Sequence, residues 1–285
     1  MSLVVTGATG HLGRLAVEAL LERGVAADQI VATGRNTDKL ADLAARGVTV
    51  RTADYTGPAS LVAAFAGADK VLLISSSEVG QRAVQHRNAV DAAREAGVSL
   101  LAYTSILRAD TSTLVLAPEH KATEEYIRES GVPFVFLRNG WYTENWTGQV
   151  ATAVEHGVVL GAADGGRVSA ATRADYAAAA AAVLTGEGHE GKAYELGGDE
   201  AFTLDEYAAE VARQSGKPVA YQNLSEQEYA TTLAGYGLPQ PVAEMLADSD
   251  AGIARGELLT ETGDLSRLAG RPTTPLSKAV ADALA

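Results

Sequence analysis

Short apolar segments alternate with amphipathic segments through the first half of the chain. Runs such as 71–74 and 132–137 are apolar without interruption, as in strands whose two faces are both covered by helices. The pattern predicts strands near 3–6, 30–34, 48–52, 70–74, 99–104 and 133–137, with helices near 12–23, 37–46, 58–66, 81–96 and 118–130. Such alternation implies right-handed βαβ crossovers. We therefore expect an α/β protein with a Rossmann-like, doubly wound parallel sheet.

The alternation ends after Arg138. Glycine-rich turns at 161–166 and 186–191 introduce less regular segments. Their pattern predicts helices near 173–184, 204–215, 225–234 and 239–249, and a short strand near 219–222. We predict a Rossmann domain over residues 1–140 and a smaller C-terminal α/β substrate domain over residues 141–285. Part of the second segment, about 167–190, is expected to return to the first domain.

Composition narrows the class of protein. A chain of 285 residues with 47% hydrophobic content can bury a large core without cross-links. It has no cysteine, which excludes disulfides and thiol nucleophiles and agrees with a reducing, cytoplasmic compartment. A net charge of −13 argues against a nucleic-acid surface. The sequence shows neither a basic leader nor an apolar run near the roughly 20 residues that span a bilayer. Its five histidines have no metal-ligand spacing, so no metal is expected.

The stretch LVVTGATGHLG, residues 3–13, runs from an apolar strand through three glycines into a helical pattern. In a βαβ unit the first glycine allows a tight turn, the second lets backbone approach a pyrophosphate, and the third lets the helix pack close to the strand. The N–H groups of the helix then meet the phosphates. We expect a dinucleotide to bind along Gly7, Ala8, Thr9, Gly10, His11, Leu12 and Gly13. The alternative is a tight βα turn without a ligand.

The end of the second strand bears on which nicotinamide cofactor is preferred. An acidic residue there would bind the ribose of NAD, whereas this chain has Arg35 followed by Asn36. A guanidinium suits the 2′-phosphate of NADPH. Alternatively, Arg35 is a solvated loop cation and Asn36 caps the next helix. Asp54, after the third strand, either accepts a hydrogen bond from the adenine amine or caps a turn.

Hydroxyl and aromatic side chains follow two later strands. Ser75, Ser76 and Ser77 end the fourth strand, where ligands bind in open α/β sheets, although such serines also cap helices. The segment 137–146 holds both tryptophans, Trp141 and Trp146. Its aromatic side chains form either a slot for a planar substrate beside the nicotinamide or an apolar junction between the two domains.

These residues together resemble the NmrA-like, atypical branch of the short-chain dehydrogenase/reductase superfamily, and within it the type 2 NAD(P)H:quinone oxidoreductases. The resemblance covers nearly the whole chain. It rests on TGATGHLG (6–13), RTADY (51–55), LLISSSEVGQR (72–82), AYTS (102–105), LRNGWYTEN (137–145), ATRADYA (171–177) and YQNLSE (221–226). It implies an NADPH-preferring enzyme that reduces quinones by two electrons. It also implies cofactor contacts from residues 7–12, Arg35, Ser75 to Ser77, Asn139, Gly140, Trp141, Tyr142, Thr143 and Glu144, and places Arg173 near the substrate or the domain junction.

One departure from the wider superfamily bears on mechanism. Most short-chain dehydrogenases pair a catalytic tyrosine with a lysine four residues later, and none of the ten tyrosines here has one. A quinone is already electrophilic and needs little acid assistance, so positioning carries most of its reduction. Hydrogen bonds from Tyr142, Asn139 or His120 are expected to stabilise the developing oxyanion, with Trp146 beside the substrate.

His120 itself is either a proton relay or ribose contact, or an ordinary surface histidine. Two other functions stay open, namely reduction of triphenylmethane dyes or other electrophiles, and cofactor sensing by a non-catalytic regulator. Both a monomer and a homodimer are compatible with the sequence.

Overall fold

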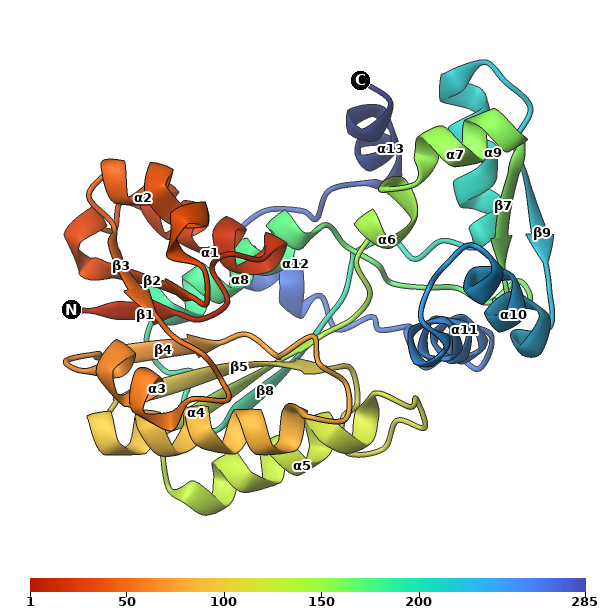
Figure 1. Cartoon of the computed structure of the whole chain (residues 1–285). Coiled ribbons are helices and arrows are strands. Elements are labelled where there is room, and N and C mark those ends of the chain that lie inside the picture. Colours follow the sequence, from red (N-terminus) through yellow and green to blue (C-terminus); the bar gives the residue numbers. More distant parts are fainter.

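The computed structural model describes residues 1–285 and contains two parallel sheets. The larger has seven strands in the order β3-β2-β1-β4-β5-β6-β8, and the smaller pairs β7 with β9 (Figure 1). The strands are β1 (Leu3–Val5), β2 (Ile30–Gly34), β3 (Thr49–Thr52), β4 (Lys70–Leu73), β5 (Leu100–Ile106), β6 (Phe134–Asn139), β7 (Val158–Gly161), β8 (Lys192–Leu196) and β9 (Ala220–Asn223). All pairings within both sheets are parallel.

Thirteen α-helices and two short 3₁₀ turns connect the strands. The helices are α1 (His11–Glu22), α2 (Ala41–Ala45), α3 (Pro58–Phe65), α4 (Arg82–Ala96), α5 (Ala117–Ser130), α6 (Glu144–Thr147), α7 (Val150–His156), α8 (Arg173–Thr185), α9 (Leu204–Ser215), α10 (Glu226–Gly235), α11 (Gln240–Ala254), α12 (Asp264–Ala269) and α13 (Leu276–Leu284), and the turns are η1 (Ala27–Gln29) and η2 (Thr37–Leu40). No helix is both long and apolar enough to cross a bilayer.

Helices cover both faces of the large sheet. On one face α1 packs against α8, which also contacts α12; on the other, α4 packs between α3 and α5 (Figure 1). Strand side chains alternate between the two layers: Leu3 and Val5 belong to the core under α1 and α8, whereas Val4 belongs to the core under α3 and α4. Both faces are therefore apolar, which explains the uninterrupted apolar runs.

The sheet order reverses beside β1. Its residue Leu3 is in register with Ile30 of β2 on one side and Lys70 of β4 on the other. The connections from these strands leave in opposite directions, so a crevice opens at their carboxyl ends. This is the part of the fold that positions the site.

A smaller unit lies beyond the carboxyl edge of the sheet (Figure 1). It contains β7, β9 and the surrounding helices, and its own apolar core includes Trp146, Phe202, Tyr207 and Val211. The Rossmann-like sheet with a smaller C-terminal α/β unit is the predicted fold, and this prediction is confirmed.

Several elements differ from their prediction. The helix expected over 37–46 is interrupted, because η2 occupies its first four residues and only α2 is α-helical. The sequence pattern missed β7, β8, α6, α7, α12 and α13. Strand β8 matters most, because it extends the large sheet beside β6 although it lies more than fifty residues later in the chain.

Candidate functional site

A cavity of about 470 Å³ opens at the carboxyl ends of β1, β2 and β4. Only five of the 22 residues that line it are hydrophobic, so it suits a polar, extended ligand. Its lining includes the glycine turn, the serine run, and side chains from both halves of the chain. Residues expected to bind a cofactor that line it are Gly7, Thr9, Gly10, His11, Leu12, Gly13, Arg35, Ser75, Ser76, Ser77 and Tyr142.

The glycine turn brings the first turn of α1 to the cavity. Gly7 has φ +60°, a left-handed conformation that favours glycine. A Cβ on Gly13 would lie 2.3 Å from the Gly7 carbonyl oxygen, so α1 packs against the turn only with glycine there. A Cβ on Gly10 would meet only the same oxygen, at 3.3 Å. No side chain caps the N-terminus of α1, which leaves its first N–H groups for an anion.

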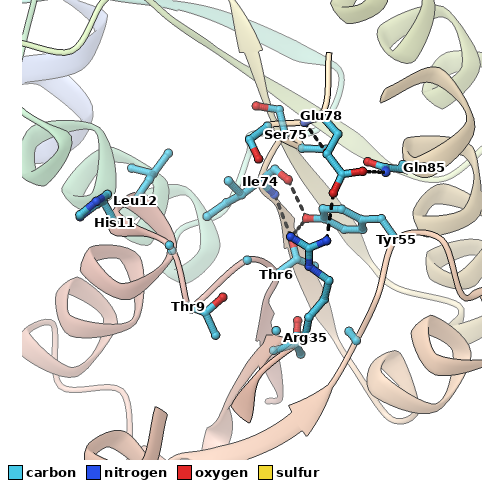
Figure 2. Close-up of a pocket in the computed structure, with 18 of the residues that line it drawn as sticks. Thr6, Thr9, His11, Leu12, Arg35, Tyr55, Ile74, Ser75, Glu78 and Gln85 are labelled. Atoms are coloured by element: carbon cyan, nitrogen blue, oxygen red, sulfur yellow. Dashed lines mark hydrogen bonds and ion pairs between the residues drawn. The ribbon is translucent and has the colours of Figure 1, made fainter. Parts of the chain in front are cut away.

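Arg35 extends from the end of β2 across the cavity toward the loop after β4 (Figure 2). Its Nη1 lies 2.9 Å from Oε1 of Glu78, whose Oε2 accepts a hydrogen bond from Gln85. Arg35 is thus not an unpaired loop cation. The pair is solvent-exposed, at 67% for Arg35 and 41% for Glu78, so an incoming anion can compete for the guanidinium. Asn36 caps the following turn through the N–H of Asp38, as one of the two interpretations held.

Tyr55 forms part of the cavity wall between β1 and β4 (Figure 2). Its hydroxyl lies 2.6 Å from both the Ile74 carbonyl oxygen and Oγ1 of Thr6. Oγ1 of Thr6 in turn accepts the N–H of Ile74. Asp54 accepts from the N–H and hydroxyl of Thr56, which lowers the pKa of its carboxyl; it caps a turn and also lines the cavity.

The serine run is held by backbone hydrogen bonds to side chains behind it. The N–H of Ser75 donates to Oγ1 of Thr104, and that of Ser76 donates to Nε2 of His86. Oγ of Ser76 accepts the N–H of Glu78, as in a capping turn. The run therefore holds a defined shape at the cavity edge, with Ser77 exposed.

Arg82, the first residue of α4, is a cavity-lining residue that sequence analysis did not single out. It is only 8% exposed, and its Nε donates to the Ser76 carbonyl oxygen at 2.6 Å. Its backbone N–H donates to Oε1 of Glu119. The guanidinium forms no ion pair with any carboxylate of the chain. Burial lowers the pKa of Arg82.

His120 is buried behind Arg82 and does not line the cavity. Its Nδ1 lies 2.8 Å from the Tyr103 hydroxyl, and its Nε2 lies 3.4 Å from Nη1 of Arg82. The interpretation of His120 as a surface histidine is therefore wrong. Burial, followed by the charge of Arg82, lowers the pKa of His120 well below its usual range, so the ring is neutral.

Tyr142 and Arg173 line the cavity from the second half of the chain. The Arg173 guanidinium lies over the Tyr142 ring, 4.5 Å from its centroid, and its Nη1 is 3.6 Å from Oε2 of Glu144. The Tyr142 hydroxyl is 3.5 Å from Nδ2 of Asn139. Burial raises the pKa of Tyr142, so its hydroxyl stays protonated and able to donate.

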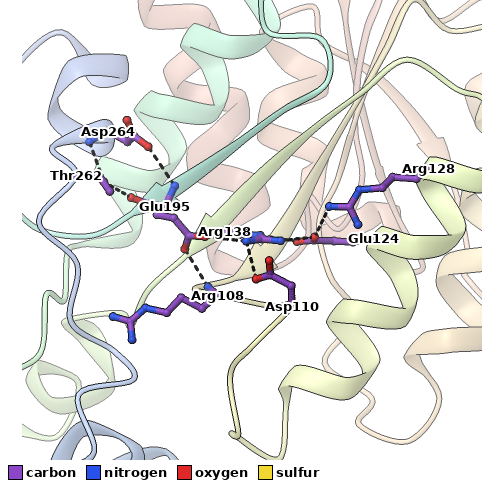
Figure 3. A network of polar contacts seen from close by, with 8 residues as sticks. All are labelled: Arg108, Asp110, Glu124, Arg128, Arg138, Glu195, Thr262 and Asp264. Atoms are coloured by element: carbon purple, nitrogen blue, oxygen red, sulfur yellow. Dashed lines mark hydrogen bonds and ion pairs between the residues drawn. The ribbon is translucent and has the colours of Figure 1, made fainter.

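A buried ionic network fixes the strand end that carries Asn139 (Figure 3). Arg138 makes two hydrogen bonds to the Glu124 carboxylate, at 2.9 and 2.7 Å. Its Nη1 also contacts Asp110 and Glu195, at 3.0 and 2.8 Å. Although burial acts to lower the pKa of Arg138, the carboxylates of Glu124 and Glu195 raise it. The network ties α5, β6 and β8 together and holds the start of the Asn139 segment rigidly.

The remaining predicted site residues lie outside the cavity wall. They are Ala8, Asn139, Gly140, Trp141, Thr143, Glu144 and Trp146. Gly140 donates its N–H to the Leu196 carbonyl oxygen, and Glu144 accepts the N–H of Arg173. Trp146 packs edge-on against Phe202 in the C-terminal core. The aromatic segment therefore contributes one ring, Tyr142, to the cavity.

The sequence contains a weak signal for Arg82 and the other polar residues of α4 near the cavity. Arg82, Gln85 and His86 lie on one face of α4 together with Ala89 and Ala93, and all are buried. Polar residues at buried helical positions are a signal for a site or a polar network. The predicted helix near 81–96 matches α4, but its face of polar and small residues was not recognised as buried.

The comparisons with known proteins agree with this geometry. A family model described as NAD(P)H-binding matches residues 7–187. Quinone oxidoreductase 2 of Escherichia coli is 55% identical over 98% of this chain and 97% of its own length. A crystal structure of the NADPH-dependent quinone oxidoreductase from Escherichia coli, complexed with NADPH, has a TM-score of 0.96 and 54% identity, and covers 99% of this chain and 100% of that chain. Triphenylmethane reductase of Citrobacter sp., complexed with NADP(H), has a TM-score of 0.93 and 43% identity, with the same coverage. The chain therefore belongs to the NAD(P)H-binding, NmrA-like family that includes quinone oxidoreductase 2 of Escherichia coli.

Proposed function

We propose that this protein transfers a hydride from NADPH to a quinone and so reduces it by two electrons to the hydroquinone. The observation that carries the proposal is its near-complete match, at a TM-score of 0.96, to an NADPH-dependent quinone oxidoreductase complexed with NADPH. The cavity fits such a cofactor, because it combines open N–H groups at α1, an exchangeable guanidinium at Arg35 and a polar run at Ser75 to Ser77.

The proposed contacts follow the cavity from end to end. Residues 7–13 bind the pyrophosphate, with Ala8 supporting the turn from behind, and Arg35 binds the 2′-phosphate after releasing Glu78. The serine run meets the nicotinamide ribose. NADPH supplies the hydride when bound. The segment 139–144 shapes the nicotinamide end through Tyr142, while its other residues act by holding Tyr142 and Arg173 in place.

Tyr142 is the proposed hydrogen-bond donor to the quinone oxygen, and Asn139 orients its hydroxyl. Its protonated state at neutral pH suits this role. His120 is neutral and lies behind Arg82, so we assign it a positioning role there. Trp146 supports the site from the C-terminal core, and Arg173 stacks on the Tyr142 ring at the substrate end.

A triphenylmethane dye is a second candidate acceptor, favoured by the similarity to triphenylmethane reductase. Such dyes are cations. The guanidinium groups of Arg82 and Arg173 line the same cavity as Tyr142, and their charges partly oppose the rise in its pKa that burial causes. Their charge disfavours a cationic acceptor and favours a neutral one that becomes anionic. The proposal also includes a cytoplasmic location for the protein, a small-molecule quinone as its partner, and a monomer or homodimer as its assembly.

The test is NADPH oxidation followed by absorbance with 1,4-benzoquinone, with malachite green, and with neither. We expect faster oxidation with the quinone and one hydroquinone formed for each NADPH consumed. Added cytochrome c serves as the control for two-electron transfer, because a semiquinone would reduce it and a hydroquinone formed directly reduces it more slowly. Binding of NADPH without accelerated oxidation by quinone would contradict the proposal.

A further inference from the structure

We propose that Arg82 is a catalytic residue whose guanidinium stabilises the negative charge that hydride transfer leaves on an acceptor oxygen. The inference rests on the proposed quinone reduction and extends it, because it defines the class of acceptor. The acceptor class is a neutral carbonyl compound whose hydride adduct is an oxyanion.

The first observation is that the Arg82 guanidinium forms no ion pair with a carboxylate. Its Nε is used by the Ser76 carbonyl oxygen and its Nη1 lies beside the neutral His120. Its Nη2 makes no hydrogen bond within the protein and is not fully enclosed by it. The buried Arg138 is different, because it faces carboxylates of Glu124, Glu195 and Asp110.

The second observation is that the side chains of His86, His120 and Tyr103, which pack behind Arg82, are neutral. Burial and the Arg82 charge lower the pKa of His86 to about 3, and His120 is likewise neutral. Burial raises the pKa of Tyr103, so that phenol is protonated. Glu119 accepts the backbone N–H groups of Gly80 and Arg82, and its charge acts to raise the pKa of Arg82 without forming an ion pair with the guanidinium. No ion pair neutralises the guanidinium, and its positive charge therefore acts on the cavity that Arg82 lines.

A buried charge without a partner costs free energy, and such a cost is characteristic of functional sites. Fixed positive charge in a cavity partly shielded from water is the arrangement that stabilises an oxyanion formed during reaction. Tyr142 lines the same cavity, and the charge of Arg82 acts to lower its pKa. Arg82 and Tyr142 can thus approach one acceptor oxygen from two elements that are distant in sequence.

The reaction balances as follows. The C4–H bond of the reduced nicotinamide breaks, and its hydrogen leaves with both electrons to form a new bond on the quinone. NADPH becomes NADP⁺ and the quinone becomes the hydroquinone monoanion. Arg82 stabilises that anion, and water then donates the proton that completes the hydroquinone. The guanidinium need not lose a proton at any step.

The kinetic test compares Arg82→Met with Arg82→Lys, and uses Arg87→Met as a matched control. Arg87 lies on the exposed side of the same helix, so its replacement removes the same charge. We expect Arg82→Met to lower kcat/KM for 1,4-benzoquinone by about 10²–10³-fold, with partial recovery in Arg82→Lys and no loss in Arg87→Met. The Kd for NADPH should stay within about threefold. A kcat/KM within about threefold of wild type in Arg82→Met overturns the proposal.

A second measurement separates electrostatic stabilisation from a merely structural role. In the complex with NADP⁺, 4-nitrophenol is titrated by absorbance, and its pKa in the site is compared among the same proteins. Wild type and Arg82→Lys should lower this pKa relative to Arg82→Met, since only a local charge favours the phenolate. Equal values in wild type and Arg82→Met overturn the proposal. If wild type does not reduce quinones at all, the proposed function fails, whereas this titration still decides the role of Arg82.

Discussion

Replacing either member of the ion pair between Arg35 and Glu78 should have opposite effects on NADPH affinity. If Arg35 binds the 2′-phosphate, then Glu78 competes with that phosphate for the same guanidinium. Arg35→Ala should therefore weaken NADPH binding and leave NADH binding almost unchanged. Glu78→Gln should instead strengthen NADPH binding, because the guanidinium no longer has to leave a carboxylate.

The magnitudes follow from the exposure of the pair. Hydrogen bonds to a charged group are worth about 1.5–3 kcal/mol, so Arg35→Ala should narrow the preference for NADPH over NADH by about 10- to 150-fold. With 67% and 41% of the two side chains exposed, the pair itself is strongly screened. Such pairs contribute about 0.2–1 kcal/mol, so Glu78→Gln should improve the Kd for NADPH by only about 1.4- to 5-fold.

The assay is calorimetric titration of each protein with NADPH and with NADH. Arg46→Ala is the matched control, because it removes an arginine from a similar ion pair, with Glu18 at 2.7 Å, outside the cavity lining. It should leave both affinities unchanged. Equal affinities of the wild type for the two cofactors, or weaker NADPH binding in Glu78→Gln, would exclude Arg35 as the 2′-phosphate ligand that Glu78 competes for.

Three further predictions follow from the fold and the site. Gly10→Val should reduce NADPH affinity more than about tenfold with little loss of stability. Gly13→Ala should instead lower the free energy of unfolding by about 1–3 kcal/mol, because the new Cβ would lie 2.3 Å from the Gly7 carbonyl oxygen. Calorimetry and thermal unfolding measure both, and a stable Gly13→Ala protein would contradict the packing argument. Tyr142→Phe should lower kcat/KM for quinone by about five- to tenfold at unchanged NADPH affinity, and an unchanged kcat/KM would remove the hydroxyl from the mechanism. Burial raises the pKa of Asp250 from 3.8 to about 7, so its contribution to stability is complete below pH 3.8 and is lost as the pH rises to about 7. Asp250→Asn should abolish this loss of stability, which is at most about 4 kcal/mol. Urea unfolding of both proteins at acid and neutral pH measures the loss. The same pH dependence in Asp250→Asn as in wild type would exclude Asp250 as the source of the loss.

Features of this protein that depend on local spacing can be predicted from short segments of the chain. The apolar run from Val71 to Leu73 forms a strand covered on both faces, as its pattern predicts. The three glycines of the turn act on one another within seven residues, so their roles in bending and close packing are encoded locally. The fold class and the position of the cofactor turn therefore follow from short segments.

Contacts between residues that are distant in the chain depend on how the separate elements pack. Nothing near Arg35 in sequence identifies Glu78 as its partner, and nothing near Trp146 places its ring against Phe202. The local pattern of β8 does not name β6 as its neighbour. Arg82 and His120 are polar residues on amphipathic helices, and their burial depends on how α4 and α5 pack together. Local propensity reflects the backbone and its nearest neighbours, whereas burial, ion pairing and the resulting pKa shifts arise when separate elements exclude water between them.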